Sequence, residues 1–229
     1  MTIQVLIEMS THQTYRSPQD CPAVVPLFPL AGALLLPRGQ LPLNIFEPRY
    51  VAMIDEAIAS HRVIGMIQPD DEEDAAIPRL YPVGCTGRIT QFAETGDGRY
   101  VISLTGVSRF RIVEELTVAT PYRQARVDYE PFKVDFEPRA GEAETDRAGV
   151  IRTLKEFAEA NDLKVDWKGI NEAPNEALVN ALSMMSPFGT REKQALLEAP
   201  DLKSRAEMLI AITEIEMVRD SENPDSTLQ

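Results

Sequence analysis

The spacing of hydrophobic residues changes partway along this 229-residue chain. Up to about Lys133, short apolar runs alternate with turn residues, and several runs alternate apolar with polar positions, which is typical of half-buried strands. Beyond Thr145, apolar residues recur every three or four positions, which is typical of amphipathic helices. We therefore expect an α+β protein in which a β-rich region, residues 22–133, precedes a helical bundle, residues 145–222.

Prolines interrupt the first apolar runs of the β-rich region. Val25–Leu30 contains two prolines and Leu36–Tyr50 contains three. Proline has no N–H group to donate to a strand ladder, so it is found mostly on edge strands and at bulges. These segments are therefore predicted to be short edge strands at the rim of a small, irregular barrel. The next segment, Pro48–Ser60, has the spacing of a helix.

Three later segments have the composition of further strands. Val63–Ile67 is a short apolar run, typical of a buried strand. Val83–Ala93 and Tyr100–Gly106 flank a turn rich in glycine and aspartate, which favours a hairpin. Cys85 falls on the inward-facing positions of this alternation, so it is predicted to pack as a small hydrophobe rather than to react.

The rest of the chain divides into a linker, helices and tails. Pro131, Pro138, Gly141 and many charges occur between Glu130 and Glu144, and they mark residues 134–144 as a linker. Thr145 is a candidate N-cap of the first helix after it, while Pro174, Thr190 and Pro200 mark the starts of three more. Residues 1–21 and 223–229 are expected to be flexible tails.

Composition narrows the class of protein. No apolar run approaches the roughly 20 residues of a membrane-spanning helix, and the N-terminus lacks a secretory layout, so we expect a cytoplasmic protein without a membrane partner. Two cysteines and two isolated histidines indicate neither a disulfide framework nor structural zinc. The net charge of −13 disfavours a nucleic-acid partner. Residues 22–133 carry 14 acidic and 11 basic residues, a net of −3, and residues 134–229 carry 20 and 11, a net of −9.

The motifs of common catalytic chemistries are absent from the sequence. It has no phosphate-binding Gly-x-x-x-x-Gly-Lys-Ser/Thr loop, no Gly-x-Ser-x-Gly elbow, no His-Glu-x-x-His zinc motif and no Gly-x-Gly-x-x-Gly after a strand. No carboxylate pair lies in apolar surroundings that would clearly raise a pKa. We therefore expect no catalytic residue, no cofactor and no metal.

Aromatic and charged residues gather near the second proline-rich segment. Phe46, Glu47, Arg49 and Tyr50 follow closely on one another, and Arg38 precedes them. Beside edge strands with unpaired ladder groups, these five residues form our candidate polypeptide-binding site. Three alternatives stay open: Phe46 packs in the core, Glu47 and Arg49 cap and orient the following helix, or the aromatic residues stack single-stranded bases.

Short motifs occur in a characteristic order from about Pro22 to Val218. They are Pro26-Leu-Phe-Pro-Leu30, Leu36-Pro-Arg-Gly39, Pro42-Leu-Asn-Ile-Phe-Glu-Pro-Arg-Tyr50, Val83-Gly-Cys-Thr-Gly-Arg-Ile89, Leu104-Thr-Gly-Val-Ser-Arg-Phe-Arg-Ile112, Pro121-Tyr-Arg-Gln-Ala-Arg-Val127 and Glu192-Lys-Gln-Ala-Leu-Leu-Glu198. Together they resemble the N-terminal, substrate-binding domain of the ATP-dependent Lon protease, of peptidase family S16. The chain is most similar to the stand-alone bacterial proteins that consist of that domain.

The resemblance implies a PUA-like pseudo-β-barrel followed by a helical bundle, a region that helps the protease to capture substrates and assemble its ring. The ATPase domain and the Ser-Lys peptidase domain of that protease have no counterpart in this sequence. The implied function is a non-catalytic binding module for unfolded or tagged polypeptides or a partner protein, with an adaptor- or chaperone-like role in protein quality control. Alternatives are an RNA-binding module and an accessory subunit of an ATP-dependent peptidase. Self-association into a homo-oligomer stays open.

Overall fold

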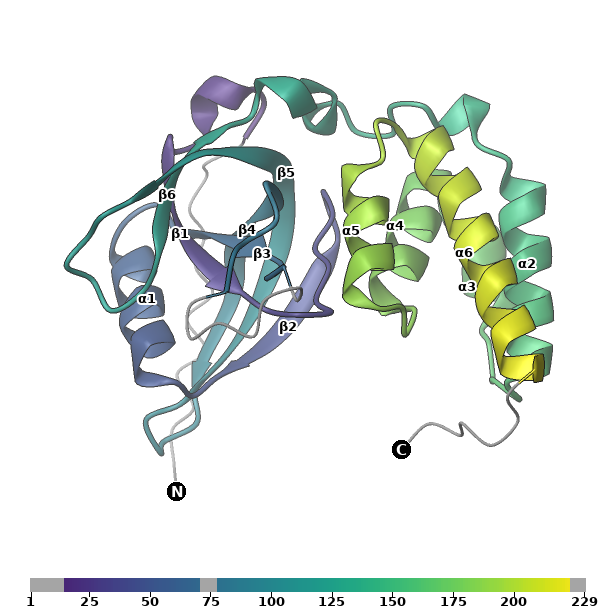
Figure 1. Cartoon of the computed structure of the whole chain (residues 1–229), viewed down its shortest axis with the longest axis horizontal. Coiled ribbons are helices and arrows are strands. Elements are labelled where there is room, and N and C mark those ends of the chain that lie inside the picture. Colours follow the sequence, from purple (N-terminus) through teal and green to yellow (C-terminus); the bar gives the residue numbers. More distant parts are fainter. Residues whose placement is uncertain (1–14, 71–77, 223–229) are drawn as a thin grey trace. The chain divides into compact units, whose positions relative to one another are not determined.

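The structure is a computed structural model that describes residues 15–70 and 78–222. The chain divides into two compact units, Met1–Pro138 and Arg139–Gln229. The first unit is built mainly of strands and the second of helices (Figure 1). Within the described ranges, no helix is both long and apolar enough to cross a membrane.

In the described part of the first unit, the chain forms six strands and one α-helix, besides short 3-10 helices (Figure 1). The elements are β1 (Val24–Pro29), β2 (Gln40–Ile45), α1 (Pro48–Ala59), β3 (Val63–Ile67), β4 (Val83–Glu94), β5 (Tyr100–Leu116) and β6 (Gln124–Asp128). The strand order is β2-β5-β4-β3-β1-β6, and an additional pairing of β5 with β6 closes five of the strands into a barrel. The expected α+β architecture, a pseudo-barrel followed by helices, is confirmed.

The length of β5 allows the barrel to close. This strand has 17 residues and pairs with three others. Its first part, from Tyr100 to Thr105, lies between β2 and β4, and its last part, from Arg111 to Leu116, pairs with β6. The pairing of β5 with β4 has two register shifts and its pairing with β6 has one, and such irregularities increase the local bend and twist of a strand. The sheet can therefore curl back on itself.

The prediction that β1 is an edge strand is wrong, because β1 lies between β3 and β6. Its first half, Val24 to Pro26, pairs with β6, and its second half, Leu27 to Pro29, pairs with β3. Successive backbone amides of a strand point to opposite sides. The Leu27 amide donates to the carbonyl of Arg123, just before β6, so the nitrogen of Pro29, two residues on, also points to the β6 side, where the pairing of β1 with β6 has already ended. The nitrogen of Pro26 points to the β3 side, where the pairing of β1 with β3 has not yet begun. Each missing N–H group thus falls on the side without a partner strand.

The prediction of an edge position is right for β2, which has β5 as its neighbour among the described strands. The carbonyl of Gly39 accepts a hydrogen bond from the amide of Gly106, so the backbone groups of Leu41 and Leu43 also face β5. The backbone groups of the alternate residues, including Pro42, face the open edge. Proline therefore removes the middle hydrogen-bond donor from that edge.

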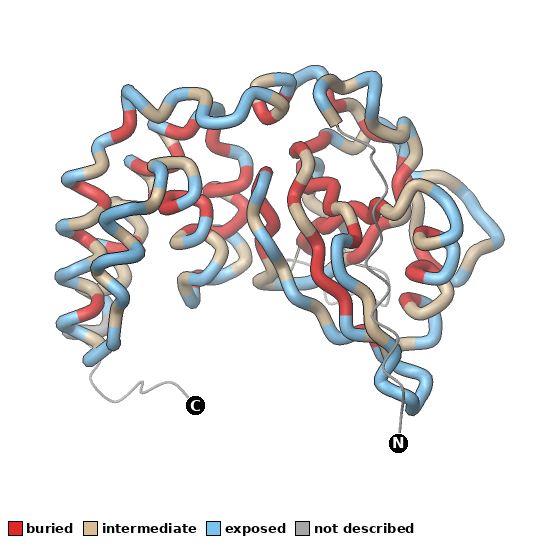
Figure 2. Tube along the Cα trace, turned by 180° about the vertical axis from the view of Figure 1, so that it is seen from behind, coloured by how far each residue is buried: buried red, intermediate tan, exposed pale blue. Residues whose placement is uncertain are grey.

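Buried positions run along the strands of the barrel (Figure 2). One cluster of its core consists of Val25, Leu27, Ile67, Phe110, Ala125, Val127 and Tyr129. Phe110 packs against backbone, since a Cβ atom on Gly84 would lie 2.5 Å from both the Phe110 ring and the carbonyl oxygen of Met66. Cys85 is 1% exposed, as its expected packing role requires.

The residues just before β1 are folded, whereas a flexible tail was expected up to residue 21. Residues 18–20 form a short 3-10 helix, and the Asp20 carboxylate accepts hydrogen bonds from the amides of Arg16 and Ser17. Cys21 packs against the barrel core, and burial raises the pKa of its thiol to about 12. The rest of that expected tail, residues 1–14, and the expected tail 223–229 lie outside the described residues.

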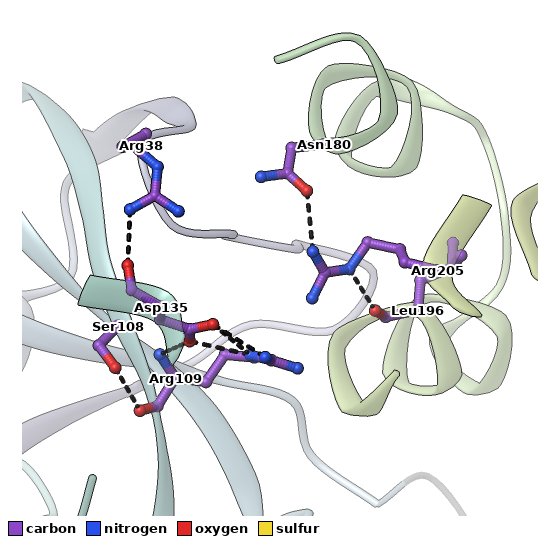
Figure 3. Close-up of polar contacts among 7 residues, drawn as sticks. All are labelled: Arg38, Ser108, Arg109, Asp135, Asn180, Leu196 and Arg205. Atoms are coloured by element: carbon purple, nitrogen blue, oxygen red, sulfur yellow. Dashed lines mark hydrogen bonds and ion pairs between the residues drawn. The ribbon is translucent and has the colours of Figure 1, made fainter. Parts of the chain in front are cut away.

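A buried ion pair joins β5 to the segment after β6. The Arg109 guanidinium donates to the Asp135 carboxylate through Nε at 2.9 Å and through Nη2 at 2.8 Å, and the Arg109 amide donates to the same carboxylate at 2.9 Å (Figure 3). The guanidinium also stacks on the ring of Phe132. Asp135 belongs to a 3-10 helix, η2 (Glu130–Phe136), which extends into the expected linker. This helix is therefore fastened to the barrel.

Helices form the second unit. They are the short 3-10 helix η3 (Glu142–Glu144), α2 (Arg147–Ala160), α3 (Trp167–Glu172), α4 (Asn175–Met185), α5 (Thr190–Glu198) and α6 (Leu202–Glu222). α6 packs against α2, α4 and α5. Arg205 of α6 is buried, and its guanidinium donates to the carbonyl of Leu196 and to the side chain of Asn180 (Figure 3). One side chain thus connects three helices.

Two local details of the second unit differ from expectation. Asp146 rather than Thr145 caps α2, because its carboxylate accepts a hydrogen bond from the amide of Gly149. The short helix α3 was not predicted from the sequence. It has only six residues and none of them is buried, so it has no apolar stripe to reveal it.

We expect Pro42→Val to increase self-association. The substitution adds an N–H group and a β-branched residue to the open edge of β2, and a continuous apolar edge favours pairing with another chain. Analytical ultracentrifugation over a range of concentrations measures the effect. Pro42→Lys is the matched control, because it adds the same N–H group together with a charge that opposes pairing. Equal sedimentation of Pro42→Val and the parent protein at every concentration would show that the proline does not protect this edge.

We expect Asp135→Asn to lower the free energy of unfolding by about 3–5 kcal/mol, because it leaves the buried Arg109 guanidinium without its counter-charge. Urea denaturation followed by circular dichroism measures the change. Glu114→Gln is the control, because Glu114 and Arg126 form an exposed ion pair that contributes less than about 1 kcal/mol. A similar, small effect of both substitutions would mean that the buried pair does not stabilise the barrel.

Candidate functional site

A groove with a volume of about 560 Å³ opens on the first unit. Its lining comes from the end of β1, the first turn of α1 and the connection from β5 to β6, together with Pro69 and Pro78. Half of the lining residues are aliphatic or proline, among them Leu27, Leu116, Val118 and Pro121, and two more are tyrosines. A groove of this size and character is typical of sites that bind small molecules or short peptide segments.

The start of α1 forms one side of the groove. Pro48 occupies the first helical position, and the carbonyl of Glu47 accepts hydrogen bonds from the amides of Tyr50 and Val51. The side chain of Glu47 makes no capping bond and instead accepts from the Arg49 guanidinium at 2.9 and 2.8 Å. The Glu47 side chain therefore does not cap the helix, contrary to the alternative in which Glu47 and Arg49 do so.

Tyr50 is held in place by two ring contacts. Its ring meets the ring of Phe28 edge-on at 4.3 Å between centroids, and the guanidinium of Arg49 lies 4.5 Å from the Tyr50 ring centroid. Both arrangements are favourable for aromatic rings. The side chain is only 7% exposed, so these contacts fix its direction.

The Tyr50 hydroxyl makes no hydrogen bond with any residue in the described part of the chain, although the residue lines the groove. Burial raises the pKa of this hydroxyl, while Arg49 and Arg123 lower it and Glu47 raises it, so the group lies within electrostatic reach of both groove arginines. A raised pKa keeps the hydroxyl protonated near neutral pH. It can therefore donate a hydrogen bond to a ligand.

The connection from β5 to β6 forms the other side of the groove. Arg123 donates to both carboxylate oxygens of Glu115, at 2.8 and 2.6 Å, and to the carbonyl of Pro78 at 2.8 Å. The hydroxyl of Tyr122 donates to the carboxylate of Glu56 on α1. These bonds tie the connection to its own strand, to Pro78 and to α1, so the groove has fixed walls.

The five residues predicted from the sequence do not form one cluster. Arg49 and Tyr50 line the groove, and Glu47 pairs with Arg49 beside it. Phe46 does not line the groove and is 62% exposed, so it is not the core residue considered as an alternative. Arg38 lies elsewhere, where its amide donates to Gly106 and its guanidinium donates to the carbonyl of Asp135.

The prediction missed the second wall. Glu115, Tyr122 and Arg123 lie about seventy residues after Tyr50 in the sequence, and the pairing of β5 with β6 brings them to the groove. Tyr122 and Arg123 belong to the motif Pro121–Val127, but periodicity identifies strands and not their partners, so nothing local placed these residues beside Tyr50. Among the residues that the structure describes, no group of three His, Cys, Asp or Glu could hold a metal ion.

The fold and the groove define a class: an α+β domain with a PUA-like barrel, an open groove beside its first helix and a separate helical unit. The family model described as the ATP-dependent protease La (LON) substrate-binding domain matches residues 24–214. The chain belongs to this family.

Two curated relatives show how the similarity is distributed. Lon protease 2 of Myxococcus xanthus is 30% identical over 205 residues, which are 85% of this chain and 24% of that protein. Lon protease of Anaeromyxobacter dehalogenans is 28% identical over 201 residues, which are 85% of this chain and 23% of that protein. The chain thus spans about a quarter of the length of these relatives.

Solved structures share the fold. A Lon N-terminal domain protein from Xanthomonas campestris matches 82% of this chain and 97% of its own, with a TM-score of 0.59 and 21% identity. The N-terminal domain of a Mycobacterium avium complex Lon protease matches 83% of this chain and 98% of its own, with a TM-score of 0.60 and 20% identity. At this identity the matches establish the arrangement of the elements.

Proposed function

We propose that this chain is a non-catalytic module that binds non-native polypeptide segments, and that the groove beside α1 is the binding site. The observation that carries the proposal is the groove itself: an open, mostly apolar channel of about 560 Å³ in a domain of a substrate-binding family. The substrates of a protease are polypeptides, and unfolded chains expose apolar side chains that such a lining can bury.

The groove suits this task better than the strand edge does. Strand addition to a sheet depends on main-chain hydrogen bonds along the edge. In β2 the proline at position 42 removes a donor from the middle of the open edge, and β1 is enclosed between two strands. A bound polypeptide therefore gains more from side-chain burial in the groove than from pairing with β2.

Charge disfavours the RNA alternative. Phosphate binding requires cations that can neutralise phosphates. Arg49 and Arg123, the arginines that line the groove, each pair with a carboxylate, Glu47 and Glu115 respectively. The site thus offers little net positive charge to a nucleic-acid backbone. A protein-binding role, as an adaptor or as an accessory subunit for an ATP-dependent peptidase, agrees better with this balance.

We expect Val118→Asp to weaken the binding of an unfolded polypeptide at least tenfold, because it places a charge on the apolar lining of the groove. The test is fluorescence anisotropy with a labelled, reduced and carboxymethylated model protein. Val113→Asp is the matched control, since Val113 is an exposed valine outside the lining and its substitution is expected to change the affinity less than twofold.

Two results would overturn the proposal. One is the absence of saturable binding by the correctly folded parent protein across several unfolded clients. The other is an equal loss of affinity in both valine variants, which would place the binding surface outside the groove. Filter binding with single-stranded RNA at low and moderate salt tests the alternative, because binding through phosphates weakens steeply as salt rises.

A further inference from the structure

The groove combines the hydroxyl of a mostly buried tyrosine with two arginines that are each paired with a carboxylate, and this combination indicates what kind of polypeptide it accepts. Resting on the proposed function, we infer that the Tyr50 hydroxyl donates a hydrogen bond to a main-chain carbonyl of the bound segment, and that Glu47 and Glu115 make the site reject acidic segments. Tyr50, Glu47 and Glu115 would then determine specificity, beyond the burial of apolar side chains.

The first step concerns the Tyr50 hydroxyl. A tyrosine hydroxyl can donate a hydrogen bond to any acceptor that reaches it. Tyr50 lines the groove and makes no hydrogen bond within the described residues, and its hydroxyl is not among their fully buried atoms without a partner, so it is open to solvent. Its ring is mostly buried between Phe28 and Arg49, so the hydroxyl is held in one position. An acceptor on a ligand can take the place of solvent at this hydroxyl.

The second step concerns the kind of acceptor. A carboxylate would be favoured beside two unpaired arginines, but here each guanidinium already has a counter-charge. Glu47 accepts from Arg49 through two nitrogen atoms, and Glu115 accepts from Arg123 in a bidentate pair. An incoming carboxylate would meet these two carboxylates, and like charges at short range repel. A main-chain carbonyl is neutral and avoids this repulsion.

The third step concerns the surroundings of the acceptor. An extended segment presents carbonyl groups at regular intervals, with side chains between them. The groove offers apolar surface from Leu116, Val118 and Pro121, and Tyr50 belongs to the same lining. A segment can thus bury apolar side chains while one carbonyl accepts from Tyr50. Recognition of this kind tolerates many sequences, since every residue has a carbonyl.

The experiment uses two peptides with blocked termini. The neutral peptide contains Leu, Val and Ala, so its only acceptors are main-chain carbonyls, and the acidic peptide replaces two of these residues with Asp. Isothermal titration calorimetry with the full chain measures both affinities. We expect the parent protein to bind the neutral peptide more tightly, and Tyr50→Phe to weaken that binding about three- to tenfold. Phenylalanine keeps the ring contacts and removes only the hydroxyl.

A second variant tests the role of charge independently. Glu115→Gln leaves the Arg123 guanidinium without its carboxylate, so it is expected to bind the acidic peptide at least fivefold more tightly than the parent does, with an affinity that falls as salt rises. Glu114→Gln is the matched control. It removes the same charge from the neighbouring residue, which pairs with Arg126 and does not line the groove.

The outcomes separate this inference from the proposed function. If the folded parent protein binds neither peptide nor an unfolded model protein, the proposed function fails and this inference fails with it. If the parent binds the neutral peptide but Tyr50→Phe binds it equally well, the inference is wrong and the proposed function stands. The same holds if the parent prefers the acidic peptide, or if both glutamate variants respond alike. Circular dichroism confirms that each variant is folded.

Discussion

The barrel depends on the ion pair between Arg109 and Asp135. Arg109 lies on β5 between the part that pairs with β2, which ends at Thr105, and the part that pairs with β6, which begins at Arg111. A charged group at 1% exposure is tolerated only when its donors are satisfied, and here one carboxylate accepts from the guanidinium and from the amide of the same residue. Asp135 therefore accepts from the Arg109 amide in the part of β5 that pairs with neither β2 nor β6. The ion pair also holds the segment after β6 against the barrel.

Closure of the barrel in turn builds the groove. Because β6 pairs with the end of β5, the connection between them is placed beside α1, where Tyr122 bonds Glu56. The same connection supplies Arg123, whose guanidinium reaches both Glu115 and the carbonyl of Pro78. Strand pairing thus positions one wall of the groove, whereas the other wall forms locally, because Pro48 begins α1 directly before Arg49 and Tyr50. Fixed walls reduce the ordering that a ligand must induce on binding.

The local wall was predictable from the sequence and the remote wall was not. Arg49 and Tyr50 stand in one motif, so adjacency was enough to bring them together. Strands such as Val63–Ile67 and the hairpin around Gly96 were likewise identified from local pattern and turn chemistry. The position of β1 was misjudged, because the effect of a proline depends on which side of the strand has a partner at that residue, and Pro26 and Pro29 face opposite sides, each where no partner strand is paired. Pairing of distant segments is a tertiary property that periodicity does not encode.

A domain that captures extended chains must avoid capturing its own copies through exposed strand edges. The edge of β2 lacks a donor at Pro42, whereas the proposed binding in the groove uses side-chain burial and one hydroxyl, so under that proposal capture and self-pairing would use different parts of the barrel. The same separation explains the charge pattern. In a chain of net charge −13, unpaired arginines in an open groove would attract the acidic surfaces of other copies. Pairing Arg49 with Glu47 and Arg123 with Glu115 removes that attraction, and under the proposed function it would leave apolar burial as the main source of affinity.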